Sequence, residues 1–338
     1  MFANNYKVGS LYAGVGGICL GFKNADFHLT WANEFDKNAC ITYRKNFDHC
    51  LYEEDIWKLD PKNLQKVDIL TAGFPCQPFS VAGYRKGFED DRGNHFFRII
   101  EYIDAIQPKV LFLENVKNLE NHDKGNTFKV IKETLEAKKY TVFHKVLNTK
   151  DFGNVPHNRE RIFIIAFDQS CFPGIKFKFP DPEPLTKTIK DIIQNKEMPA
   201  AFNYGEDKYM YSALTLAMKS EETIYQWRRH YVRENKSNVC PTLTANMGTG
   251  GHNVPLIKTK FGFRKLTPEE CFAFQGFPVF ENNYRLPQLA NSHLYKQAGN
   301  SVSVPVIERL ANSIKSTIES YNRKLKKNSL KVEKSLVN

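Results

Sequence analysis

Short apolar runs alternate with helix-like stretches over the first 170 residues, and this alternation constrains the fold more than any other feature. The runs that we predict to be strands are residues 8–12, 29–33, 68–72, 110–113, 140–147 and 161–167. Predicted helices lie between them at residues 18–23, 37–46, 93–106 and 127–138. Strands separated by such helices form mostly parallel sheets with helices on both faces. The last two strands follow each other without a helix, so we expect an antiparallel hairpin at one sheet edge.

The regular alternation of strand and helix patterns ends after Phe167. A proline-rich stretch, residues 171–188, is predicted to be a linker or an extended crossover. The chain up to about residue 260 is then irregular, with aromatic, basic and glycine-rich patches, and we predict a second, smaller domain there. Helix signals return at residues 267–274, where Thr267 and Glu270 have capping-box spacing, and at residues 304–321.

The charge of the chain favours a polyanionic partner. The net charge is +11, and residues 323–338, with six basic groups and one acidic group, contribute +5 of it. That stretch is most simply a solvated basic tail, but the remaining +6 still favours nucleic acid. The seven cysteines show no CxxC spacing, which argues against a zinc ribbon or a disulfide scaffold and indicates a cytoplasmic protein. No apolar run reaches the roughly 18 residues of a membrane span, and no signal peptide is visible.

A glycine-rich turn follows the first predicted strand. Gly14, Gly16 and Gly17 could bring the backbone close to a nucleotide, although the spacing is not GxGxxG and a purely structural turn would look the same. Glu34, at the end of the next strand, could accept both hydroxyl protons of a ribose. Asp55 could accept from an adenine amino group. Either acid could instead be an ordinary exposed side chain.

Cys76 lies just beyond a predicted buried strand, at the edge where open α/β sheets bind their ligands. Pro75 and Pro78 flank it and impose a stiff, non-helical backbone, which favours a nucleophile over a small core residue. The thiolate is the reactive form of such a group. Glu114 ends another strand and should reach the same rim. There it could bind a base edge and, if burial keeps it protonated, supply a proton.

Two arginines and a late loop complete the candidate site. Arg159 and Arg161 alternate into a strand, so both side chains could face one site, unless they form an exposed ion-pair edge with Glu160. Asn300 lies between a glycine and a helix. That position suits closure over a cofactor tail, although a plain loop-to-helix junction would look the same.

Five sequence blocks, in this order, resemble the DNA (cytosine-5)-methyltransferase family, especially bacterial type II restriction-modification methylases. They are GFPCQPFS, LENV, NRER, RKLTPEECFAFQGFP and QAGNSVSVPV, and the resemblance covers nearly all of residues 7–320. It implies an α/β, Rossmann-like, S-adenosylmethionine-dependent fold with a mixed, mostly parallel sheet and a small, irregular target-recognition domain. The implied division is a large domain of residues 1–182 and 289–322, a small domain and hinge of residues 183–288, and a basic tail of residues 323–338.

The resemblance also implies a role for each candidate residue. Cys76 would attack C6 of a cytosine flipped out of duplex DNA, Glu114 would hold its N3 and amino edge, and Arg161, supported by Arg159, would hold its O2. Other residues would bind S-adenosylmethionine: Tyr12, Gly14, Gly16, Gly17, Glu34, Phe35, Asp55, Ile56, Pro75, Asn300 and Ser301. A last group, from the active-site loop and the recognition domain, would contact DNA: Gln77, Ser80, Arg92, Thr242 and Leu243. The implied protein is a monomer without a metal ion, whose cognate restriction endonuclease acts separately.

Three other classes of protein are weighed against this interpretation. An RNA cytosine-5 methylase would share the fold, but its tRNA-methylating members carry a Cys-Phe-Thr motif that is absent from this sequence. A nicotinamide dehydrogenase would need a GxGxxG motif after the first strand, which this sequence lacks, and would give Cys76 no catalytic role. A non-catalytic DNA-binding module would suit the basic charge but needs neither the proline-flanked cysteine nor the cofactor turn.

Overall fold

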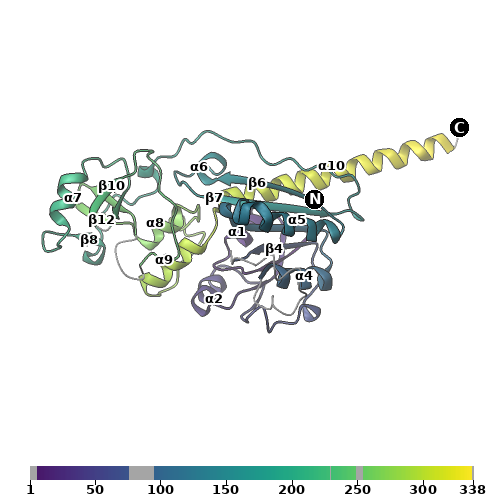
Figure 1. The fold of residues 1–338 in the computed structure, drawn as a ribbon, viewed down its shortest axis with the longest axis horizontal. Helices are drawn as coiled ribbons and strands as arrows, with labels where there is room; N and C mark the ends of the chain where they lie inside the picture. Colours follow the sequence, from purple (N-terminus) through teal and green to yellow (C-terminus); the bar gives the residue numbers. More distant parts are fainter. Residues whose placement is uncertain (1–5, 76–94, 229, 249–253, 337–338) are drawn as a thin grey trace.

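The computed structural model describes residues 6–75, 95–228, 230–248 and 254–336, with side chains up to Lys327. A seven-stranded sheet, in the order β3-β2-β1-β4-β5-β7-β6, forms its centre (Figure 1). Only β7 runs antiparallel to its neighbours, β5 and β6, so the mostly parallel sheet and its edge hairpin are confirmed. The short strand β3 is the one that the sequence pattern missed. The strands are β1 (Lys7–Leu11), β2 (His28–Asn33), β3 (Cys50–Tyr52), β4 (Ile69–Gly73), β5 (Val110–Val116), β6 (Tyr140–Asn148) and β7 (Glu160–Asp168).

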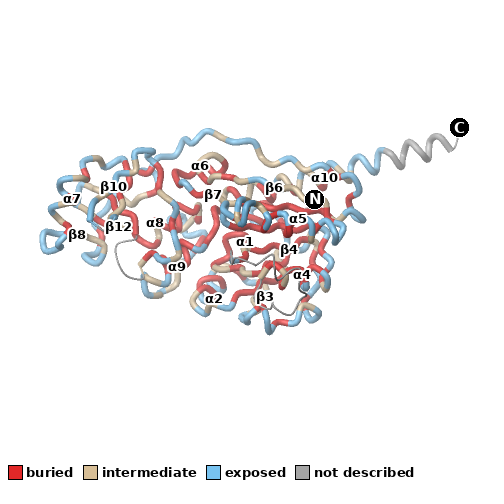
Figure 2. The backbone as a smooth tube through the Cα atoms, in the orientation of Figure 1, coloured by how far each residue is buried: buried red, intermediate tan, exposed pale blue. Residues whose placement is uncertain are grey.

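Helices cover both faces of this sheet, as its buried strands require. Phe22 of α1 (Gly17–Asn24) and Ile307 of α10 (Val304–Leu336) pack on one face, in a cluster that includes Phe112. On the other face, α4 (His95–Ile106) and α5 (Asn126–Ala137) pack against residues such as Leu113. Figure 2 shows the resulting buried interior. The remaining helices of this part are α2 (Lys37–Arg44) and the single turn α6 (Thr149–Phe152).

A second, five-stranded antiparallel sheet lies in the part of the chain that the sequence predicted to be irregular. Its order is β10-β9-β11-β12-β8, and α7 (Tyr211–Ala217) packs against it through Leu214. The prediction that this region is irregular is therefore wrong. Its strands are only two to four residues long, which is too short to show the alternation of apolar and polar residues that marks a strand. The strands are β8 (Asn203–Tyr204), β9 (Tyr225–Arg228), β10 (Tyr231–Glu234), β11 (Leu256–Thr259) and β12 (Gly262–Lys265). The domain boundaries themselves remain a prediction.

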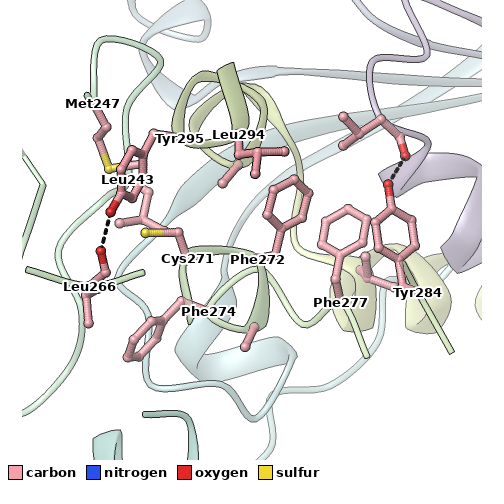
Figure 3. Close-up of a cluster of buried hydrophobic side chains, with 14 of the residues drawn as sticks. Leu243, Met247, Leu266, Cys271, Phe272, Phe274, Phe277, Tyr284, Leu294 and Tyr295 are labelled. Atoms are coloured by element: carbon pink, nitrogen blue, oxygen red, sulfur yellow. Dashed lines mark hydrogen bonds between the residues drawn. The ribbon is translucent and has the colours of Figure 1, made fainter. Parts of the chain in front are cut away.

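Two C-terminal helices return the chain to the large sheet. The predicted capping box is confirmed at α8 (Pro268–Ala273), and α9 (Asn291–Asn300) follows. The Tyr284 hydroxyl donates to the Val15 carbonyl oxygen at 2.5 Å and so fixes this region to the glycine-rich turn (Figure 3).

The last helix is longer than predicted. We expected it to end near Tyr321, but α10 continues to Leu336 and projects away from the rest of the chain (Figure 1). No glycine or proline interrupts it after Pro305, and its last turns are rich in lysine and leucine, which favour helix. Within the described ranges, no helix combines the length and the apolarity that crossing a membrane requires.

Candidate active site

A cavity of about 530 Å³ opens at the carboxyl ends of β1, β2, β4 and β5. It brings together most of the described candidate residues: Tyr12, Gly14, Gly17, Glu34, Phe35, Pro75, Glu114, Arg159, Arg161, Asn300 and Ser301. Cys76, Gln77, Ser80 and Arg92 lie outside the described residues. Pro75, the residue directly before Cys76, lines the cavity.

The glycine-rich turn forms one wall of the cavity. Gly14 has a φ of +56°, and a Cβ added there would meet no atom within 4 Å, so the space beside it is open. The Glu34 carboxylate holds the turn, because it accepts the Gly14 N–H at 2.8 Å. It also accepts the N–H groups of Phe35 and Asp36, at 2.9 and 2.8 Å. A carboxylate offers about four acceptor positions, so roughly one is left for a ligand.

Glu114 and Arg161 form a nearly buried pair in the same cavity. The Arg161 Nε atom lies 3.1 Å from Glu114 Oε1, and the side chains are 15% and 10% exposed. The antiparallel pairing of β5 and β7 produces this proximity, since Arg161 lies across from Val116, two residues beyond Glu114. Burial raises the pKa of the Glu114 carboxyl group, while Arg161 and Arg159 oppose that shift. The site therefore contains an acid that burial helps to keep protonated beside a fixed positive charge.

Arg159 is buried and contacts backbone rather than Glu114. Its Nη1 donates to the Leu243 carbonyl oxygen at 3.0 Å. Its Nη2 donates to the carbonyl oxygens of Gly299, at 3.2 Å, and Ser301. The two arginines thus line one cavity, as expected from their spacing, but they have different partners.

Four candidate residues lie away from the cavity lining, and another is built into the turn. Asp55 is exposed and accepts the Trp57 N–H at 3.1 Å, and Ile56 is in the core. Leu243 is also buried, and both its backbone N–H and its carbonyl are used within the protein. A role for Leu243 in DNA binding therefore has to be indirect, whereas Thr242 is exposed. Gly16, with a φ of +86°, directly precedes α1 and is not among the lining residues.

The structure adds cavity residues that the sequence analysis missed. His95 Nδ1 lies 3.0 Å from the Tyr12 hydroxyl oxygen, and burial lowers the pKa of His95. Lys296 joins α9 to the start of α2 through an ion pair with Asp36 at 2.8 Å. No local sequence signal marks these residues, because long-range packing brings them to the site.

The glycine-rich turn held by Glu34 and the Glu114–Arg161 pair lie at one edge of this sheet. Together they define a Rossmann-like, cofactor-dependent enzyme. The chain belongs to the C-5 cytosine-specific DNA methylase family, whose sequence model matches residues 6–316. The resemblance stated above is confirmed, and the protein is a DNA (cytosine-5)-methyltransferase.

Individual relatives are similar over nearly their whole length. Type II methyltransferase M.Bsp6I from Bacillus sp. (strain RFL6) is 59% identical, over 91% of this chain and 98% of that protein. Type II methyltransferase M.NgoBI from Neisseria gonorrhoeae is 40% identical, over 90% and 91%. The crystal structure of a Spodoptera frugiperda DNMT2 mutant has a TM-score of 0.70 at 22% identity, covering 91% of this chain and 99% of that one. This last similarity supports the fold.

Proposed function

We propose that the protein methylates C5 of a cytosine flipped out of a short, specific duplex DNA sequence, through a covalent bond between Cys76 and C6. One observation carries this proposal: the nearly buried Glu114–Arg161 pair faces the same cavity as the turn held by Glu34. An enzyme that moves a methyl group onto a base needs a base pocket and a cofactor pocket that open onto each other.

The proposed base pocket, which is the site for the flipped cytosine, divides the chemistry among Cys76, Glu114 and Arg161. The Cys76 thiolate adds to C6, and the electron pair of the C5–C6 double bond shifts toward N3, which makes C5 nucleophilic. Once C5 carries the methyl group, loss of its hydrogen as a proton to water expels the Cys76 thiolate and restores the C5–C6 double bond. Glu114 holds N3 and the amino group and supplies a proton to N3 as electron density builds there. Arg161 holds O2. The cytosine must leave the helix to reach them, at a cost of a few kcal/mol.

The cavity fits S-adenosylmethionine, the cofactor that the family implies. The space beside Gly14 is open, and the buried Ser301 hydroxyl has no hydrogen-bond partner within the described chain. Glu34 would bind the ribose through its remaining acceptor position, and the rest of the cofactor would contact Tyr12, Phe35, Pro75, Asn300 and Ser301. Asp55 and Ile56, although not part of the described lining, would lie toward the adenine. When bound, S-adenosylmethionine supplies the methyl group.

We expect Glu34→Ala to weaken S-adenosylmethionine binding by about 1.5–3 kcal/mol, the worth of a charge-assisted hydrogen bond. Because Glu34 also holds the turn, the thermal midpoint should fall as well. Calorimetry measures the cofactor affinity, and fluorescence anisotropy should show a smaller change in DNA binding. Glu133→Ala, on the exposed face of α5, is the matched control. Unchanged cofactor affinity in Glu34→Ala would contradict the assignment.

Target recognition is proposed to lie in the small sheet and its loops, which are separate from the strands that carry the catalytic residues. Contacts to base edges specify the DNA sequence, whereas contacts to phosphates add affinity without specifying it. Exchanging residues 187–265 for those of a relative with another specificity should change which cytosine is modified. Ending the exchange at Lys265 keeps β12 with its partner β11.

Removal of residues 322–338 should leave the choice of DNA site unchanged, with at most a small, salt-sensitive loss of DNA affinity. Bisulfite mapping checks both variants, and an active exchange variant that still marks the original site would place recognition elsewhere.

Relatives named type II methyltransferases support the proposal that the protein protects host DNA from a partner restriction endonuclease. Methyl transfer from labelled S-adenosylmethionine to duplex DNA and to tRNA tests the substrate. Bisulfite sequencing of DNA from an expressing host then identifies the site. Label on duplex DNA supports the proposal, whereas label on tRNA alone would overturn it.

A further inference from the structure

Residues 156–159, which lead into β7, are joined to residues 240–243 by backbone hydrogen bonds. The Cys240 N–H donates to the Pro156 carbonyl oxygen at 2.6 Å, and the Asn158 N–H donates to the Cys240 carbonyl oxygen at 2.7 Å. The Thr242 hydroxyl adds a bond to the Asn158 carbonyl oxygen at 2.6 Å. The segment that contains Thr242 and Leu243 is thus paired with the chain that carries Arg159 and Arg161.

His157 lies within this pairing and is fully buried. Its Nδ1 is 2.8 Å from the Phe274 carbonyl oxygen, and its Nε2 is 3.3 Å from the Leu243 backbone nitrogen. A carbonyl can only accept and a backbone N–H can only donate, so Nδ1 carries the proton and Nε2 accepts. Burial, together with the neighbouring Arg159 and Arg161, keeps the pKa of His157 well below its ordinary value. The neutral imidazole therefore satisfies both contacts.

Leu243 is held from both ends. Its N–H is bound by His157 and its carbonyl oxygen by Arg159, which also binds the carbonyl oxygens of Gly299 and Ser301. Gly299 lies so close to this segment that an added Cβ would come within 2.2 Å of the Thr244 carbonyl carbon. The Leu243 side chain packs near Cys271 and Tyr295 (Figure 3). One junction therefore joins the Thr242 segment, the end of α9 and the start of β7.

We propose that His157 is a positioning residue that fixes the Thr242–Leu243 segment relative to the base pocket. This inference rests on the proposed function. His157 does not line the cavity, so it touches neither base nor cofactor. Its effect is transmitted through Leu243, whose contact with Arg159 reaches the chain that carries Arg161. Loss of His157 should impair productive placement of DNA and leave binding of the cofactor nearly unchanged.

The test compares His157→Leu with His157→Gln. Leucine removes both polar contacts and leaves the Leu243 N–H and the Phe274 carbonyl buried without partners, and we expect kcat/KM for the cognate duplex to fall about ten- to a hundredfold. Glutamine offers one donor and one acceptor, so it should restore activity to within about threefold of wild type. The dissociation constant for S-adenosylmethionine should stay within about twofold in both. His28→Leu makes the same chemical change at an exposed histidine and serves as the control.

The measurements separate positioning from a merely structural role. A fall in kcat/KM for DNA with retained cofactor affinity, rescued by glutamine, supports the proposal. Equal loss of cofactor and DNA binding, or wild-type activity in His157→Leu, would overturn it. Should His157→Leu fail to fold, His157→Asn, which can keep only one contact, takes its place under the same criteria. Failure of the wild-type enzyme to methylate any duplex DNA would instead reject the proposed function.

Discussion

Replacing Cys76 with serine is expected to abolish methyl transfer and to leave binding of duplex DNA and of S-adenosylmethionine measurable. A serine hydroxyl has nearly the size of the thiol but ionises far less readily, so the bond to C6 does not form. Loss of a nucleophile lowers turnover by about a thousandfold or more. Pro75, the residue before Cys76, lines the cavity and is unchanged in this variant.

Labelled methyl transfer gives the rate for this variant, and calorimetry and gel shift give the two affinities. Cys171→Ser is the matched control, because Cys171 is an exposed free cysteine beyond β7 and should leave the rate unchanged. Turnover of Cys76→Ser within tenfold of wild type would show that the nucleophile has been misassigned. Loss of both affinities together with turnover would point to misfolding, which the thermal midpoint would reveal.

Much of the large sheet could be predicted because its elements carry strong local signals. The run in β5 is buried from Val110 to Asn115, as expected for a strand covered on both faces. The Thr267–Glu270 capping box likewise marks the start of α8 from sequence alone. The three residues of β3 and the short strands of the small sheet carry no comparable pattern. Their positions depend on pairing with distant strands.

The same distinction applies to the site. Glu34 and Glu114 could be found because both lie near the carboxyl edge of the sheet: Glu34 follows β2, and Glu114 lies two residues before the end of β5, which is longer than predicted. The separate tasks of Arg159 and Arg161 could not be found, because their alternation predicts a shared face but not their partners. Arg159 binds the carbonyl oxygens of Leu243 and Gly299, which lie 84 and 140 residues away along the chain. Local spacing cannot predict contacts of that range.

Glu114→Gln is expected to lower the turnover number by about a hundred- to ten-thousandfold, the range for loss of a general acid. Glutamine keeps the length of the side chain but cannot supply a proton to N3, and it leaves Arg161 without its carboxylate partner at 3.1 Å. Glu160→Gln is the control, since Glu160 is a more exposed neighbour that pairs with Lys117. Its turnover should match that of the wild type.

The pH dependence of turnover provides a second test of Glu114. Because burial raises the pKa of Glu114 above its ordinary value, the carboxyl group stays protonated to higher pH than an exposed glutamate. The proton is lost as the pH rises through that raised pKa, so wild-type turnover should decline on the alkaline side. Glu114→Gln has no such proton, and this decline should be missing from its residual rate. A variant that keeps both the wild-type rate and the wild-type pH profile would show that another group supplies the proton.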